Sequence, residues 1–461
     1  MGENSALYKN YEKLTVKGQQ KERIDALDII ESGIRRAVPY TETLKLLEVS
    51  KDRLRIGEKA YLLSEIGNIY VVGVGKGSFP IAQALDEKLG SRIKKGLVVV
   101  KEGEKRRLSH IDVFESSHPI PDERSIVAAK EMVKILAEAK KGDIVFAAIT
   151  GGSSAMANMP ADPITIDELK ALNVMLLKCG ASIGKINAVR KHICQIKGGR
   201  LLEYAAPAKI ITLTLNTAPP DMPWPDMCLP DPTTYQDAIE MLQEYRLWDQ
   251  IAPSIRNRLE KGLRGEVSET VKSLDAFDCS LYSVADPRSC CEAAAKRAEE
   301  LGYHTMLLST TLEGEAKDLG IVLAGIATEA ARFGRPVKTP CAIISGGETT
   351  VTINGTYGDG GPNQETALGF STKWYLDVPV ACASIDTDGT DGPCMIAGGI
   401  VDGLTKARAE KMGLSINNAL NTHDASNALR LLEDEIITGH TGTNVMNLRV
   451  VVVGKGGESN R

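Results

Sequence analysis

The sequence predicts a two-domain α/β protein, in which a parallel sheet covered by helices is followed by a mixed α/β domain. Three observations support this prediction. From about residue 24, continuous apolar runs alternate with stretches of helical periodicity, which is typical of a parallel sheet covered on both faces. The final third separates its strands by long glycine-rich loops, which favours a mixed sheet. The 461 residues are enough for two or three domains of roughly 100–200 residues each.

The N-terminal domain is predicted from short β-rich runs and the amphipathic stretches between them. The expected strands cover residues 68–73, 96–100, 143–150 and 209–215. The expected helices cover residues 81–89, 122–140, 165–179 and 237–245. A buried strand followed by a helix, repeated in this way, is the signature of parallel strands joined by helical crossovers.

A charged, helix-poor stretch at residues 258–278 is interpreted as a linker, which gives domains at residues 1–265 and 266–461. The second domain is expected to begin with a strand and two helices and to continue as a mixed sheet. Its expected helices cover residues 289–301 and 313–333. Its expected strands cover residues 279–284, 342–345, 349–353, 380–385 and 448–453.

Composition and charge exclude several classes of function. The net charge of −5 and the 5% aromatic content offer neither a basic field for nucleic acid nor a base-stacking platform. The N-terminus is polar, and no apolar run approaches the ~18 residues of a membrane helix. Nine cysteines without metal-like spacing indicate reduced thiols. We therefore expect a cytoplasmic protein that binds neither nucleic acid nor membrane.

The first candidate site is the turn that follows the strand at residues 68–73. Gly75, Lys76, Gly77 and Ser78 open a helix, so their backbone N–H groups and the positive helix end can approach an anion. Lys76 adds a cation, which opposes the helix dipole unless an anion or solvent offsets it. The spacing matches neither the dinucleotide fingerprint nor the Walker A motif, and a purely structural turn is the alternative.

A second turn of the same kind follows the strand at residues 143–150. Gly151, Gly152, Ser153 and Ser154 combine glycines and hydroxyls at the carboxyl edge of the sheet, where open α/β sheets bind ligands. A serine N-cap of an ordinary helix is the alternative interpretation. Two such turns in one sheet favour an anion site.

The third candidate is a basic helix face. Asn187, Arg190 and Lys191 share one face by their spacing of three and four residues, and the segment 197–200 adds further basic residues. Such a face can bind a carboxylate or a phosphate, with arginine supplying a bidentate fork. A solvated charged face is the alternative. His118 and His192 are candidate acid–base groups or structural histidines.

Four polar loops at strand ends of the second domain form the fourth candidate. The acidic run of this set resembles part of a calcium loop but lacks the final glutamate, and its oxygen ligands suit Mg²⁺ carried by a nucleotide equally well. Solvated turn residues are the alternative, and the metal ligands stay undetermined. The candidate residues are Glu348, Asn363, Gln364, Glu365, Asp386, Asp388, Asp391 and Asn444.

Taken in order, these loops resemble the glycerate 2-kinase family, whose C-terminal part is called the MOFRL domain. The resemblance extends from about residue 25 to 454 and is most specific at residues 75–77, 117–122, 151–155, 187–192, 230–234, 345–350, 386–392 and 441–444. It implies a Rossmann-like N-terminal domain, a cleft between the domains, and ATP- and Mg²⁺-dependent phosphorylation of the 2-hydroxyl of D-glycerate.

The resemblance also implies roles for individual residues. Lys76 would neutralise phosphate charge, and Asn187, Arg190 and Lys191 would bind the anionic end of the ligand. The polar residues of the C-terminal loops would line the other wall of the cleft, with Asp386 and Asp388 as catalytic carboxylates. The substrates would be a small hydroxy acid and a nucleotide. A homodimer is one candidate assembly, and the sequence does not decide it.

Three stretches of the sequence depart from the family pattern. Thr217 stands where a functional aspartate is expected, in a segment 216–221 that is also shorter than usual. Pro362 replaces an expected arginine, and Cys394 and Met395 replace a Thr-Asp pair. The paired loss of a carboxylate and a guanidinium suggests a re-purposed pocket. Two alternatives therefore stay open beside the kinase, namely a diverged binding protein with lost or altered activity and a hydroxypyruvate reductase.

Overall fold

The computed structural model describes residues 7–103, 106–118, 120–217, 227–353, 355 and 357–456. The chain forms two compact units. The parallel-sheet unit is Pro39–Val284, and the mixed-sheet unit combines Met1–Val38 with Ala285–Arg461. This division differs from the expected boundary after residue 265, because the first helices belong to the second unit and the next strand belongs to the first.

A six-stranded sheet forms the centre of the parallel-sheet unit, in the order β6-β5-β4-β7-β8-β9. Strand β4 pairs in parallel with β5 and β7, β5 with β6, and β7 with β8, while β9 lies at the edge beside β8. The strands are β4 (Ile69–Val74), β5 (Ile93–Lys101), β6 (Asp112–Ser116), β7 (Ile144–Ile149), β8 (Lys209–Leu215) and β9 (Cys279–Ala285). The predicted parallel sheet is thereby confirmed, with β6 as an additional strand.

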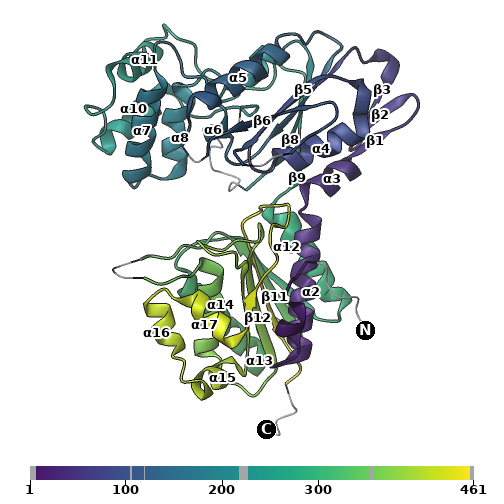
Figure 1. Ribbon diagram of the computed structural model, residues 1–461, viewed down its shortest axis with the longest axis vertical. Helices are drawn as coiled ribbons and strands as arrows, with labels where there is room; N and C mark the ends of the chain where they lie inside the picture. The colour runs from purple at the N-terminus through teal and green to yellow at the C-terminus, as the bar shows by residue number, and fades with distance from the viewer. Residues whose placement is uncertain are drawn as a thin grey trace. The chain divides into compact units, whose positions relative to one another are not determined.

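Both faces of this sheet are covered, as the continuous apolar strands require. Tyr70 and Val72 of β4 pack in one core with α5 (Glu123–Leu136). Val71 of the same strand packs in a second core with α4 (Ser78–Leu89). The two helices therefore lie on opposite faces of the sheet (Figure 1).

The rest of the parallel-sheet unit is a helical layer and a small hairpin sheet. Helices α7, α8, α10 and α11 share an apolar core of their own, and β1, β2 and β3 form an antiparallel sheet. The elements are α3 (Pro39–Leu46), β1 (Leu47–Val49), β2 (Arg53–Ile56), β3 (Lys59–Leu62), α6 (Ser153–Met156), α7 (Ile166–Lys178), α8 (Ile183–His192), α9 (Leu201–Ala205), α10 (Tyr235–Glu244) and α11 (Pro253–Leu263).

The stretch at residues 258–278, which we interpreted as a linker, is part of this fold. Its first residues complete α11. Further on, Thr270 Oγ1 donates to Asp231 Oδ2 at 3.0 Å, and the backbone N–H of Val271 donates to the Gly198 carbonyl at 3.0 Å. This charged stretch is therefore a surface segment that backbone and side-chain hydrogen bonds hold to the parallel-sheet unit.

The mixed-sheet unit has a six-stranded sheet in the order β10-β11-β15-β12-β13-β14. Strands β10 and β11 are parallel, and the remaining neighbours are antiparallel. The strands are β10 (His304–Leu312), β11 (Cys341–Gly347), β12 (Val380–Asp386), β13 (Gly398–Asp402), β14 (Glu435–Ile436) and β15 (Asn447–Val453). The predicted strand at residues 349–353 is wrong, since only the bridge of Thr350 with Glu315 forms there.

Helices cover this second sheet on both faces as well (Figure 1). One layer shares a core with the sheet and consists of α13 (Ala316–Phe333), α14 (Pro362–Lys373), α15 (Thr405–Lys411), α16 (Ile416–Asn421) and α17 (Ala425–Leu432). Helices α2 (Gln20–Arg36) and α12 (Pro287–Glu300) lie against the other face, preceded by the short α1 (Tyr11–Thr15). No helix in the described part of the chain is long and apolar enough to cross a membrane.

A buried arginine explains why the N-terminal helices belong to the mixed-sheet unit. Arg23 of α2 is fully buried, and its two terminal nitrogens contact Asp402 Oδ2 at 3.0 Å and Asp434 Oδ1 at 2.8 Å. Its Nε donates to the Leu14 carbonyl at 2.6 Å. These bonds join the start of the chain to its last third.

Candidate active site

Two glycine turns meet at the carboxyl edge of the parallel sheet. Because β4 and β7 are paired in parallel, the turns that follow them are neighbours. The Lys76 N–H donates to the Gly151 carbonyl at 2.8 Å, and the Gly77 N–H donates to Thr150 Oγ1 at 3.0 Å. Gly75 has a φ of +125°, and a Cβ there would lie 2.3 Å from Thr150 Oγ1. The two predicted turns therefore form one double loop.

His118 lies against the second turn, and nearby cations affect its pKa. A Cβ on Gly152, whose φ is +89°, would lie 3.2 Å from His118 Cδ2. Burial, Lys76 and Lys101 together lower the pKa of His118 to about 4. Its imidazole is therefore neutral at pH 7, in a positive field that suits a ligand anion.

The serines of the double loop differ in their roles. Ser78 is buried, and its Oγ donates to the Gly75 carbonyl at 2.7 Å, so it fixes the first turn. Ser153 is buried at the start of α6, next to Gly152. The buried Oγ of Ser154 has no hydrogen-bond partner among the described residues. Lys76 is exposed at the centre of the loop.

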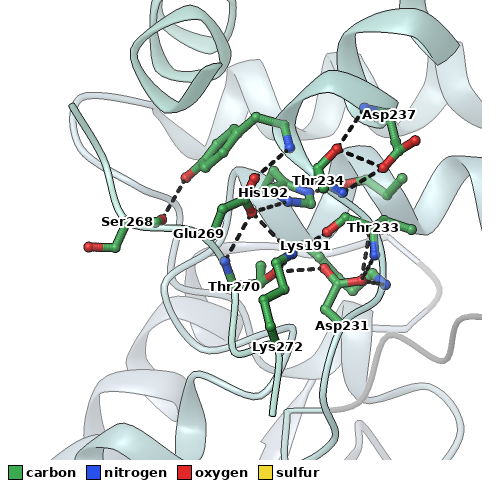
Figure 2. Close-up of polar contacts among 12 residues, drawn as sticks. Lys191, His192, Asp231, Thr233, Thr234, Asp237, Ser268, Glu269, Thr270 and Lys272 are labelled. Carbon is green, nitrogen blue, oxygen red and sulfur yellow. Dashed lines mark hydrogen bonds and ion pairs between the residues drawn. The ribbon is translucent and has the colours of Figure 1, made fainter. Parts of the chain in front are cut away.

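The basic face of α8 is split by the structure. Lys191 is fully buried and forms an ion pair and a hydrogen bond with Asp231, which is equally buried (Figure 2). Burial lowers the pKa of Lys191, and Asp231 opposes that effect. Next to it, His192 Nε2 contacts Glu269 Oε2 at 3.0 Å, and its Nδ1–H donates to the Ala188 carbonyl at 2.6 Å.

Asn187 and Arg190 form no ion pair with a carboxylate among the described residues. Arg190 Nε donates to Asn173 Oδ1 at 2.9 Å, and burial lowers the pKa of its guanidinium. Asn187 is 3% exposed, and its Oδ1 has no hydrogen-bond partner in the part of the chain that the structure describes. Lys191, in contrast, has a carboxylate partner within the protein.

In the mixed-sheet unit, three polar loops meet where β11 and β12 end and β15 begins. The register pairs Asn447 with both Gly347 and Asp386. Asn447 Nδ2 donates to Asp386 Oδ2 at 3.4 Å, and the Asp388 N–H donates to Asp386 Oδ1 at 3.0 Å. Asn444 Nδ2 donates to Asp388 Oδ2 at 3.1 Å. The topology thus gathers residues that are far apart in the sequence.

These carboxylates raise one another's proton affinity. Burial and the neighbouring Asp388 raise the pKa of Asp386 to about 9, with smaller effects from Glu348 and Asp391. Burial also raises the pKa of Glu348, against the effect of Arg449. A cation bound at this loop cluster would reduce the electrostatic repulsion between the carboxylates. The described residues include no group of three or more His, Cys, Asp or Glu side chains arranged to hold a metal ion.

Asp391 and the residues after Pro362 serve the start of α14. The fully buried Asp391 accepts from the backbone and side-chain nitrogens of Asn363 at 3.1 and 2.9 Å and of Gln364 at 3.0 and 3.2 Å. Burial raises the pKa of Asp391, although these bonds lower it. Glu365 is buried against His423, with Oε1 2.8 Å from Nδ1.

The positions that depart from the family pattern have local explanations only in part. Pro362 is the first residue of α14, where proline fits because that N–H has no helical partner. Cys394 Sγ accepts from Ser426 Oγ at 3.6 Å. Thr217 is half-buried, and residues 218–221 of the shortened segment lie outside the described residues.

One buried lysine, Lys197, is not among the site residues that the sequence predicts. Lys197 is 2% exposed, and its Nζ donates to the Ser154 carbonyl at 3.0 Å and to Asn158 Oδ1 at 2.6 Å. It was noted only as part of a basic segment. Its position beneath the second glycine turn depends on chain folding over some forty residues, which sequence spacing does not reveal.

Comparison with known proteins places this architecture in a family. Residues 25–260 match a family described as a domain of unknown function (DUF4147), and residues 341–447 match the MOFRL family. A glycerate 2-kinase from Pyrococcus horikoshii is 39% identical over 437 residues, which cover 93% of this chain and 98% of that protein. A D-glycerate 2-kinase from Thermotoga maritima is 34% identical over 397 residues, which cover 84% of this chain and 91% of that protein.

A further relative and a solved structure match most of the chain. A putative hydroxypyruvate reductase from Agrobacterium vitis is 36% identical over 84% of this chain and all of that protein. The crystal structure of a glycerate kinase from Thermotoga maritima matches with a TM-score of 0.83 at 31% identity, over 93% of this chain and 99% of that one. The chain therefore belongs to the glycerate 2-kinase family.

Proposed function

We propose that this protein is an ATP-dependent kinase that phosphorylates the 2-hydroxyl of D-glycerate or a related small hydroxy acid. The double loop at residues 75–78 and 150–154 carries the proposal, because it places the exposed Lys76 and the positive field around His118 at the carboxyl edge of the parallel sheet. The glycerate kinases among the relatives support the same reaction.

The parallel-sheet unit would bind the charged parts of the substrates. Phosphoryl transfer depends mainly on positioning and on neutralising phosphate charge. Lys76 is assigned to phosphate oxygens. Asn187 and Arg190 are assigned to the acid, since their free amide oxygen and guanidinium nitrogens match a hydroxyl and a carboxylate.

The mixed-sheet unit would supply the acid–base chemistry. The acceptor hydroxyl attacks the γ-phosphorus, the bond to the β-phosphate oxygen breaks, and ADP leaves. The hydroxyl proton passes to a carboxylate, for which we assign the deprotonated form of Asp386 in the loop cluster. Asp388 lies beside Asp386 because its backbone N–H donates to Asp386 Oδ1, and Asn444 Nδ2 donates to the Asp388 carboxylate.

Mg²⁺ is assigned to the nucleotide as part of the Mg·ATP substrate. An ion that is shared with phosphate oxygens needs only one or two protein carboxylates. The Asp386 and Asp388 pair fits that requirement, because its mutual repulsion is relieved by a cation.

The test is ADP release from Mg·ATP with D-glycerate, glycolate and lactate as acceptors. Wild-type protein is expected to release ADP with D-glycerate or one of the other acids. Lys76→Met should lower kcat/KM by about 100-fold, because a charge-assisted contact to the transferring phosphate is lost. Lys130→Met, at an exposed position of α5, is the matched control. Nucleotide binding without ADP release from any acid would refute the kinase and favour a diverged binding protein.

The reductase alternative is addressed by the first turn itself. A dinucleotide fingerprint needs glycine at the position of Ser78, whereas Ser78 is buried and its hydroxyl is bonded to Gly75. NADH oxidation with hydroxypyruvate is expected to be absent. A rate that saturates with hydroxypyruvate would establish the reductase instead.

A further inference from the structure

Lys197 is a buried cation with an unused donor. It is 2% exposed, and its Nζ donates to the Ser154 carbonyl at 3.0 Å and to Asn158 Oδ1 at 2.6 Å. An ammonium group has three N–H donors, so these two acceptors leave one. The bond to Ser154 places this ammonium directly against the second glycine turn.

Lys197 and Arg190 have no compensating carboxylate among the described residues. Among the residues that the structure describes, neither side chain forms an ion pair with Asp or Glu. The charged and titratable groups that act on Lys197 are Arg190 and Cys194, and burial together with Arg190 lowers the pKa of Lys197 to about 8. Lys197 is buried and Arg190 is partly buried, and removing cations from water without a counter-ion is costly, which favours an anion at this place.

Lys191 differs from Lys197 in having a carboxylate partner. It is buried to the same degree, but Asp231 neutralises it within the protein. Spacing on α8 favoured Lys191 as the ligand-binding lysine, whereas the ion pairs favour the lysine six residues later. The cation that lacks a protein partner is the one available to a substrate.

We propose that Lys197 and Arg190 together bind the carboxylate of the acceptor acid, and that Lys197 takes the role that helical spacing predicted for Lys191. The identity of the acid rests on the proposed function. The guanidinium of Arg190 provides a planar fork for two carboxylate oxygens. Asn187 lies on the same helix face, and its buried, unpartnered Oδ1 accepts from the hydroxyl of the acid. The set therefore selects α-hydroxy acids.

Isothermal titration calorimetry on the full chain tests this subsite, with D-glycerate and its methyl ester in the presence of AMP-PNP and Mg²⁺. Lys197→Met should weaken D-glycerate binding by about 10- to 100-fold, as expected for loss of a charged hydrogen bond. Its preference for the acid over the neutral ester should fall by the same factor. Lys185→Met is the control, since Lys185 lies on α8 but pairs with Glu244 at the surface.

The pH dependence of the wild-type protein tests the same point without a variant. Only the ammonium form of Lys197 attracts a carboxylate, so D-glycerate affinity should fall by about tenfold per pH unit above its pKa. Lys197→Arg should remove that decline, because arginine stays charged. Flat wild-type affinity from pH 7 to 10 would refute the proposal.

The outcomes separate this inference from the kinase reaction. Unchanged D-glycerate affinity in Lys197→Met, with normal ADP release, overturns the subsite and leaves the kinase intact. Binding that depends on Lys197 without any ADP release supports the subsite and refutes the kinase. A wild-type protein that binds none of D-glycerate, glycolate and lactate overturns the subsite.

Discussion

Replacing Lys191 by methionine should destabilise the protein rather than act on a substrate directly. The substitution leaves the fully buried Asp231 without its cation. Breaking a buried ion pair on one side costs about 3–5 kcal/mol. Asp231 retains three other donors, namely Thr233 N at 2.9 Å, Thr233 Oγ1 at 2.7 Å and Thr270 Oγ1 at 3.0 Å. These donors place the expected loss of unfolding free energy at about 3 kcal/mol.

Thermal and urea unfolding measure this loss. For a unit the size of Pro39–Val284, about 3 kcal/mol corresponds to a Tm lowered by about 6–12 °C. The double variant Lys191→Met/Asp231→Leu should recover most of the stability, because no unpaired charge remains. At low temperature, folded Lys191→Met should retain D-glycerate binding within a few-fold.

A different pattern would refute this reasoning about Lys191. If Lys191→Met keeps its Tm within about 1 °C, a change near the error of such melts, and loses D-glycerate binding, Lys191 contacts the ligand. In that case the pair with Asp231 is not the native role of this lysine.

Three further predictions concern the mixed-sheet unit. Arg23→Met leaves the buried Asp402 without its cation, whereas Asp434 keeps Arg408, so urea unfolding should show a loss of about 3 kcal/mol. Asp386→Asn should raise the Tm of the nucleotide-free protein at pH 8 but not at pH 4. A carboxyl whose folded pKa is raised to about 9 destabilises the fold progressively as pH rises from its unfolded value; an unchanged Tm at pH 8 contradicts this assignment. Asp391→Ala removes the acceptor of two buried N–H groups of α14, and thermal melting should show a loss of at least about 2 kcal/mol.

The elements that the sequence predicts well are those with continuous apolar runs. The strands at the centre of both sheets were found because they are buried on both faces. Strand β10 was missed because it is an edge strand with a partly exposed, mixed pattern, and β13 because it begins with two glycines. Residues 258–278 have the composition of a linker because they are charged, and the sequence gives no sign of the long-range hydrogen bonds that they form.

The candidate site divides in the same way. The two glycine turns were predictable, since parallel strands bring their carboxyl ends to one edge. The sequence could not predict which lysine lacks a carboxylate partner. That depends on the position of Asp231, which is forty residues away from Lys191 in the chain. The role of Asp391 as a partner of α14 likewise depends on a long-range contact.

The most direct test of the proposed kinase is the identity of its product. Phosphorus and carbon NMR of a reaction with Mg·ATP and D-glycerate should show ADP and a phosphate ester on the 2-hydroxyl. That product should be lost in Lys76→Met and retained in Lys130→Met. A 3-phosphate ester, or no phosphorylated acid from D-glycerate, glycolate or lactate, would contradict the proposed reaction.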